Sequence, residues 1–137
     1  MIDINKVVES LRFAESRGDL RIDEISIHED GHIGTVDFAV SAEDGRYFTP
    51  QTLYITSSFS FVDVPLCEVL PGEELKYLQW CNEKHRFPIP GCYFYIDDNN
   101  ILNGKMLVKE QDNYYGMVAP FISFFRHDLA EATSTLP

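Results

Sequence analysis

Apolar residues near the start of the chain recur at the spacing of one helix face. They are Ile4, Val7, Val8 and Leu11. Asp3 can accept hydrogen bonds from the first turn of such a helix, and Gly18 suits its end. The pattern therefore predicts an amphipathic helix over residues 3–17.

The next three apolar segments alternate with a period of two, which is typical of strands. They cover residues 20–28, 33–40 and 51–61. The alternation loses its phase near Asp23 and Glu24, which predicts a β-bulge in the first strand. Turns with an Asp-Gly pair, at residues 29–32 and 43–46, separate the three strands. We expect an antiparallel meander.

A connector and a second helix follow the meander. Pro65 and Pro71 mark residues 62–71 as the connector, and the helix is expected over Gly72–His85. Its apolar positions fall on two stripes. One stripe contains Leu75, Leu78 and Cys81, and the other contains Tyr77, Trp80 and Lys84. We expect the Leu75 stripe to pack against the sheet, which leaves the Tyr77 stripe outside the core.

The C-terminal third predicts a hairpin and a last helix. The hairpin strands are Cys92–Ile96 and Ile101–Lys109, joined by an Asp- and Asn-rich turn. The helix lies within Tyr114–Ala132, where Pro120 either occupies the first turn or kinks the helix. Its core stripe is Val118, Phe121, Ile122, Phe125 and Leu129.

The expected element order is α-β-β-β-α-β-β-α. A meander and a hairpin can join as one five-stranded antiparallel sheet with helices packed on it, which is an α+β architecture. The 137 residues fit a single domain.

The charge is strongly acidic, with 22 Asp and Glu against 11 Lys and Arg and a formal net charge of −11. This balance argues against binding to nucleic acid or to anionic membranes, both of which require clustered cations. It favours a basic protein partner reached by electrostatic steering. The alternative is that the charge only maintains solubility.

Cysteine usage and segment hydropathy indicate a cytoplasmic protein. Cys67, Cys81 and Cys92 are an odd number and form no CxxC motif, unlike the cysteines of a disulfide-stapled secreted domain. The first residues do not resemble a signal peptide, and no stretch approaches 18 uncharged apolar residues. We expect no cofactor.

Two constellations have the residue types of a reactive site. His28 and His32 flank a turn and could share a metal with Glu29 or Asp30; the alternative, which we favour, is a pair of exposed turn residues.

The second constellation is Cys81 and His85, which lie four residues apart on the second helix and could form a nucleophile and its base. We favour a packing role for Cys81, because it belongs to an apolar stripe. We therefore assign no catalytic and no metal-binding residues.

Aromatic residues, 13% of the chain, exceed what one buried stripe on each helix requires. Such a surplus is typical of protein interfaces, which are enriched in Tyr, Trp and Phe. A thick core is the alternative. The candidate binding or dimer-interface residues are Tyr77, Trp80, Lys84, Tyr114, Tyr115 and Phe124.

The C-terminal half carries a family resemblance. Residues 78–87 place Asn82 near the end of a helix, and a hairpin at 92–109 and an aromatic-rich last helix follow. This arrangement resembles the YbjN-like family of bacterial sensory transduction regulators, which is similar in fold to class I type III secretion chaperones. The resemblance implies a homodimer without enzymatic activity. It also implies binding of a protein segment by strand addition or in apolar grooves, with the second helix or adjoining sheet as the dimer contact.

Our leading hypothesis is a non-enzymatic, dimeric, protein-binding domain with a chaperone-like or regulatory role. One alternative is an acidic inhibitor or immunity-type protein that neutralises a basic partner. The other is a small metal- or thiol-dependent enzyme.

Overall fold

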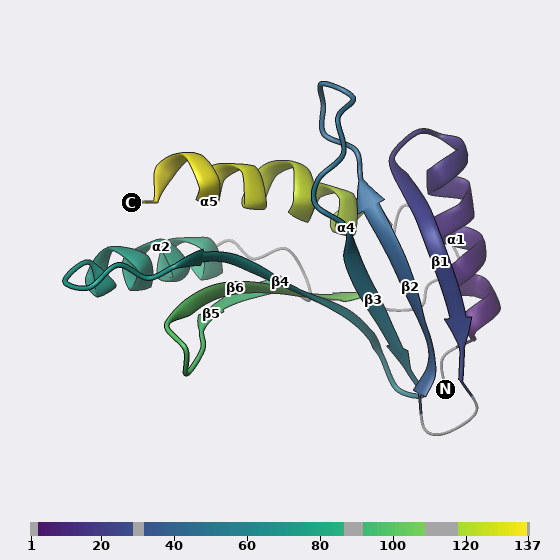
Figure 1. Ribbon diagram of the computed structural model, residues 1–137, viewed down its shortest axis with the longest axis horizontal. Coiled ribbons are helices and arrows are strands. Elements are labelled where there is room, and N and C mark those ends of the chain that lie inside the picture. Colours follow the sequence, from purple (N-terminus) through teal and green to yellow (C-terminus); the bar gives the residue numbers. More distant parts are fainter. Residues whose placement is uncertain (1–2, 29–31, 87–91, 109–117, 137) are drawn as a thin grey trace.

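The computed structural model describes residues 3–28, 32–86, 92–108 and 118–136. All of the described strands join one antiparallel sheet in the order β1-β2-β3-β4-β6-β5 (Figure 1). The strands are β1 (Leu20–Ile27), β2 (His32–Val40), β3 (Gln51–Thr56), β4 (Ser60–Glu68), β5 (Cys92–Ile96) and β6 (Ile101–Val108). The α+β class and the antiparallel sheet are therefore confirmed.

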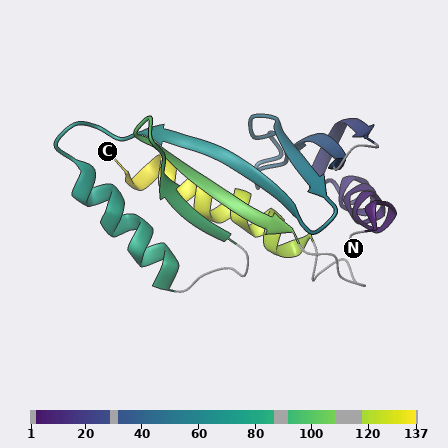
Figure 2. The same ribbon diagram turned by 90° about the horizontal axis from the view of Figure 1, so that it is seen from below.

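The helices of the described chain pack on one face of this sheet. They are α1 (Ile4–Ser16), α2 (Glu74–Arg86) and a C-terminal helix made of α4 (Ala119–Ser123), η1 (Phe124–Leu129) and α5 (Ala130–Thr135). Figure 2 shows the C-terminal helix running behind β4, β6 and β5. None of the helices in the described ranges is both long and apolar enough to cross a membrane.

The prediction of five strands is wrong, because the expected third strand is a hairpin. Residues 57–59 turn the chain, and β4 continues through the segment expected to be a connector. The Thr56 hydroxyl oxygen accepts hydrogen bonds from the backbone N–H groups of Ser58 and Phe59, and the hydroxyl donates to the Phe59 carbonyl. Such a side-chain turn leaves the apolar alternation unbroken, so periodicity alone indicates one long strand. The element order is therefore α-β-β-β-β-α-β-β-α.

Several local predictions are confirmed. The Asp3 carboxylate accepts a hydrogen bond from the Asn5 backbone N–H at 3.0 Å and caps α1. Gly18 ends this helix in the left-handed conformation, with φ of +81°. The register of β1 against β2 shifts between Ile22 and Glu24, as expected for a bulge.

The C-terminal helix supplies much of the aromatic core. Pro120 lies in its first turn, where a missing N–H costs no helical hydrogen bond. The helix then widens into a π-helical segment, so that the consecutive residues Phe124 and Phe125 are both buried. The Phe121 and Phe125 rings contact Phe38 of β2, with centroids 5.1 and 5.8 Å apart.

Gly104 of β6 lies directly beneath the Phe124 ring of this helix. A Cβ atom at residue 104 would be 2.8 Å from Phe124 Cζ and 3.1 Å from Phe94 Cε1. We expect Gly104→Ala to lower the free energy of unfolding by about 1–3 kcal/mol, as measured by urea denaturation, because two packed rings must move. The same substitution should cost less in a Phe124→Leu background, which shortens the obstructing side chain; equal costs in both backgrounds would contradict this account.

Candidate functional site

Helix α2 buries the face that we expected to lie outside the core. Tyr77 is fully buried, and its hydroxyl donates to the Glu68 carbonyl oxygen at 3.4 Å. Leu75 and Leu78 are instead 66% and 50% exposed. The prediction that the Leu75 stripe packs on the sheet is therefore wrong for both leucines, although Cys81 is buried as expected. An apolar arc this wide lets tertiary contacts choose the buried side.

Trp80 and Lys84 hold α2 to the rest of the molecule. The Trp80 ring meets Phe94 edge-on, with centroids 4.7 Å apart. The Lys84 ammonium forms ion pairs with Asp128, at 3.3 Å, and with Glu131, both on the C-terminal helix. Burial lowers the pKa of Lys84, but the hydrogen bonds to the two carboxylates outweigh it and the net pKa is raised. Lys84 therefore joins two helices of the same chain.

The remaining interface candidates divide in two. Phe124 is fully buried and lies 5.9 Å from the Phe94 ring, so it offers no surface to a partner in this conformation. Tyr114 and Tyr115 lie outside the described residues. Of the six candidates, Tyr77 and Phe124 thus belong to the core of one chain, as the alternative of a thick core expects for these two residues.

Cys81 and His85 do not form a nucleophile and base in this arrangement. His85 Nε2 accepts a hydrogen bond from the Phe94 backbone N–H at 2.9 Å, so the ring anchors α2 to β5. Burial, and then the neighbouring Cys67, raises the pKa of the Cys81 thiol. A thiol in this environment is a packing group.

The proposed histidine metal site is placed only in part. His28 is exposed after the end of β1, the backbone of His32 begins β2, and Glu29 and Asp30 lie outside the described residues. Within the described ranges, no three His, Cys, Asp or Glu side chains lie close enough together to hold a metal ion.

The sheet face opposite the helices is exposed to solvent and carries aromatic side chains. No helix of the described chain covers it, and Figure 2 views its β4-β6-β5 part from the front. We call this surface the open face. By strand alternation and register, its residues include Arg21, Glu24, Thr35, Asp37, Thr52, Tyr54, Phe61, Asp63, Pro65, Tyr93, Tyr95, Asn103, Lys105 and Leu107.

Aromatic rings form two groups on the open face. Tyr54 of β3 stacks on Phe61 of β4 with centroids 5.3 Å apart, and Phe59 lies 5.7 Å from Phe61. Tyr93 and Tyr95 of β5 lie 5.8 Å apart. Tyr54, Phe59 and Tyr93 are 40–42% exposed, although large aromatic side chains are mostly buried in folded proteins.

Polar groups orient these rings. The Tyr95 hydroxyl donates to Asp63 Oδ2 at 2.6 Å. Burial and this hydrogen bond both raise the pKa of Tyr95, so the phenol stays protonated at neutral pH. Lys105, directly opposite Asp63, places its ammonium 4.6 Å from the centre of the Phe61 ring as a cation–π contact. Asp63 and Lys105 thereby fix one ring in each group.

The β1–β2 end of the open face carries an excess of negative charge, because Arg21 is paired with Asp23 at 2.7 Å. Glu24 lies directly opposite Asp37, and the Thr52 hydroxyl donates to Asp37 Oδ1 at 2.7 Å. Among the residues that the structure describes, no cation forms an ion pair with Glu24 or Asp37. Like charges opposite each other disfavour pairing of the strands, so this arrangement suits a cationic neighbour.

The sequence predicts part of this surface, namely which residues share a strand face. Tyr93 and Tyr95 alternate with the apolar residues Cys92, Phe94 and Ile96, and this alternation alone places them on the second face of their strand. Periodicity cannot say whether that second face is covered, because the cover comes from helices that are distant in the sequence.

Comparisons with protein-family models, with curated proteins and with solved structures each find no match. A function for this chain therefore has to be inferred from its own geometry.

We expect slow alkylation of the thiols by iodoacetamide at pH 8, because only the thiolate reacts. Burial, and then the nearby Asp128, raises the pKa of Cys92 to about 12. Its thiolate fraction should be about one in ten thousand at that pH. Site-resolved mass spectrometry should show Cys81 and Cys92 reacting far more slowly than free cysteine, and at ordinary rates in 8 M urea. Rapid labelling of native Cys81 would instead support a nucleophilic role.

Proposed function

We propose that this protein is a non-enzymatic, protein-binding domain whose partner docks on the open face. The exposed aromatic residues of that face carry the proposal. Tyr54, Phe59 and Tyr93 lie on adjoining parts of a surface that no described helix covers, and Tyr and Phe are enriched where proteins bind one another. A chaperone-like or regulatory role is what the resemblance of the C-terminal half to the YbjN-like family implies.

The rigidity of the rings supports this proposal. The Phe61 ring stacks on Tyr54 and makes a cation–π contact with the Lys105 ammonium. The Tyr95 ring is held by the hydrogen bond from its hydroxyl to Asp63. Side chains ordered before binding lose little conformational entropy when a partner arrives. The open face therefore presents pre-ordered aromatic contacts on a strand framework.

A second candidate function is neutralisation of a basic partner by an acidic inhibitor. The unpaired Glu24–Asp37 arrangement favours it, together with the net charge of −11. In this case electrostatic attraction, rather than aromatic contact, would dominate binding.

Self-association through α2 is part of the proposal. Leu75 and Leu78 lie one turn apart on the outer side of this helix and are both at least half exposed. Two copies that pack these leucines together would form a homodimer and leave the open face of each chain accessible.

The double variant Tyr54→Ser, Tyr93→Ser should lose its binding partner. Quantitative mass spectrometry of proteins captured from host extract should show at least one partner whose yield falls tenfold or more. Phe13→Ser is the matched control, because it removes an aromatic residue of α1 that is 50% exposed. A partner retained equally by both variants would argue against the open face. Elution at 0.5 M NaCl, together with loss of binding in Glu24→Gln, Asp37→Asn, would favour the acidic-inhibitor alternative.

The double variant Leu75→Ser, Leu78→Ser should be monomeric where the wild-type protein is dimeric. The reason is that both exposed leucines would lie in the helix–helix contact. Light scattering after size-exclusion chromatography measures the mass against the 15.7 kDa of one chain. A wild-type protein that stays monomeric at high concentration would refute self-association, and Phe13→Ser again provides the control.

A further inference from the structure

A pocket lies where the two halves of the sheet separate. Strand β3 pairs with β4 only from Leu53↔Val62 to Ile55↔Ser60, whereas β4 pairs with β6 along its whole length. Beyond Val62 the strands diverge, as Figure 1 shows. The C-terminal helix lies behind the gap, and the remaining space has a volume of about 160 Å³.

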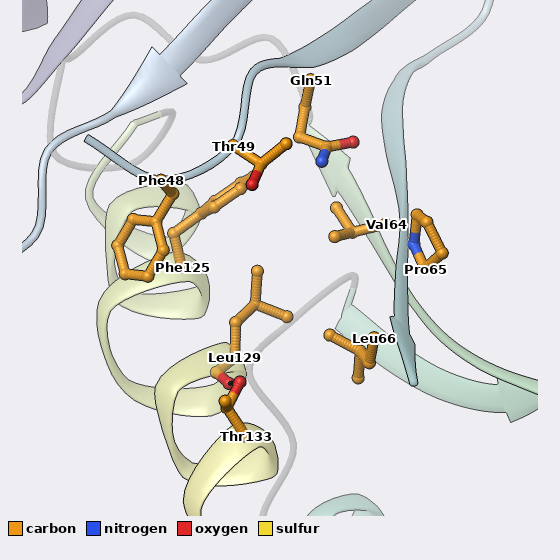
Figure 3. A pocket seen from close by; sticks show the side chains of 9 residues that line it. All are labelled: Phe48, Thr49, Gln51, Val64, Pro65, Leu66, Phe125, Leu129 and Thr133. Carbon is orange, nitrogen blue, oxygen red and sulfur yellow. Dashed lines mark hydrogen bonds between the residues drawn. The ribbon is translucent and has the colours of Figure 1, made fainter. Parts of the chain in front are cut away.

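Three parts of the chain line this pocket (Figure 3). They are Phe48 and Thr49 before β3 with Gln51 at its first position, Val64, Pro65 and Leu66 of β4, and Phe125, Leu129 and Thr133 of the C-terminal helix. The inner wall is apolar, since Val64, Phe125 and Leu129 are buried. Thr49 and Thr133 are exposed at the mouth.

The walls are held in place by contacts with one another and with the surrounding core. The Phe125 ring is fixed by Phe38, at 5.8 Å, and by Phe48, at 6.2 Å. Val64 is paired with Gly104 of β6. The pocket is therefore a preformed feature of the fold, as most small-molecule sites are.

Two polar side chains at the upper side of the pocket are available to form hydrogen bonds with a ligand. Figure 3 shows the Thr49 hydroxyl and the Gln51 amide directed toward the cavity. Neither side chain forms a hydrogen bond with another described residue, whereas the Thr133 hydroxyl donates to the Leu129 carbonyl oxygen at 3.0 Å. A ligand seated on the apolar wall could bond to Thr49 and Gln51.

We propose that this pocket binds a small neutral molecule that has one apolar group and one hydrogen-bonding group. The size follows from the volume, because an apolar protein cavity of about 150 Å³ holds benzene. Neutrality follows from the lining, because none of the 9 residues carries a charge that would compensate a buried ion. The pocket contains none of the exposed aromatic residues of the open face, and its proposal does not depend on the proposed function.

The test is a titration of the isotope-labelled protein with benzyl alcohol, followed by amide NMR. We expect saturable shifts at Thr49, Gln51 and Leu129, with a Kd of about 1 mM. Benzoate and benzylamine should bind at least tenfold more weakly. Gln51→Leu should weaken binding of benzyl alcohol but leave binding of toluene unchanged, because only the alcohol uses the amide.

A matched pair of variants on one helix turn locates the site. Thr133→Phe places a ring in the mouth of the pocket and should weaken binding at least tenfold, whereas Ser134→Phe, at an exposed neighbouring position, should not. Absence of saturable shifts, or binding that survives Thr133→Phe in a folded variant, would overturn the proposal. N-acetylphenylalaninamide mimics a phenylalanine residue of a partner protein. If this compound bound and benzyl alcohol did not, the pocket would be a site for a partner's side chain and the small-molecule proposal would be overturned. Tyr93→Ser should bind benzyl alcohol as the wild type does, which separates this result from the fate of the open face.

Discussion

Strand β4 pairs with two neighbours over unequal lengths, and the shape of the molecule follows from this inequality. Its first residues join β3, while the whole strand, from Ser60 to Glu68, joins β6. The β1-β2-β3 half and the β6-β5 half are thus hydrogen-bonded through one short region and separate beyond it (Figure 1). Core-facing residues on either side of the gap require cover, because exposed apolar surface is unfavourable.

The C-terminal helix provides that cover by contacting both halves of the sheet. Phe125 packs against Phe38 and Phe48 of the β1-β2-β3 half, and Phe124 packs against Phe94 of β5. Neighbouring residues of a regular helix point about 100° apart, so the two rings diverge toward different targets. The π-helical segment that contains them keeps both buried. The space that the rings do not fill is the pocket between β3, β4 and this helix.

Concentrating the helices on one face leaves the other face to interact with water or with a partner. On that face the aromatic rings pair with each other and with polar groups, as Phe61 does with Lys105 and Tyr95 with Asp63. The thiols and His85 lie on the helix side, where burial raises the thiol pKa values and the imidazole accepts a backbone hydrogen bond. The structure thus concentrates packing on one face of the sheet and leaves exposed aromatic rings on the other.

Local interactions were readable from the sequence by itself. It determined the Asp3 cap, the end of α1 at Gly18, the bulge between Ile22 and Glu24, the antiparallel alternation and the acidic charge, because each depends on residues a few positions apart. Only the tertiary structure decided which sides are buried. It turned Tyr77 inward by a contact with the preceding strand, and it left the face of Tyr93 open because every described helix packs on the opposite side. Burial of a face depends on segments far apart in the sequence, and periodicity contains no information about them.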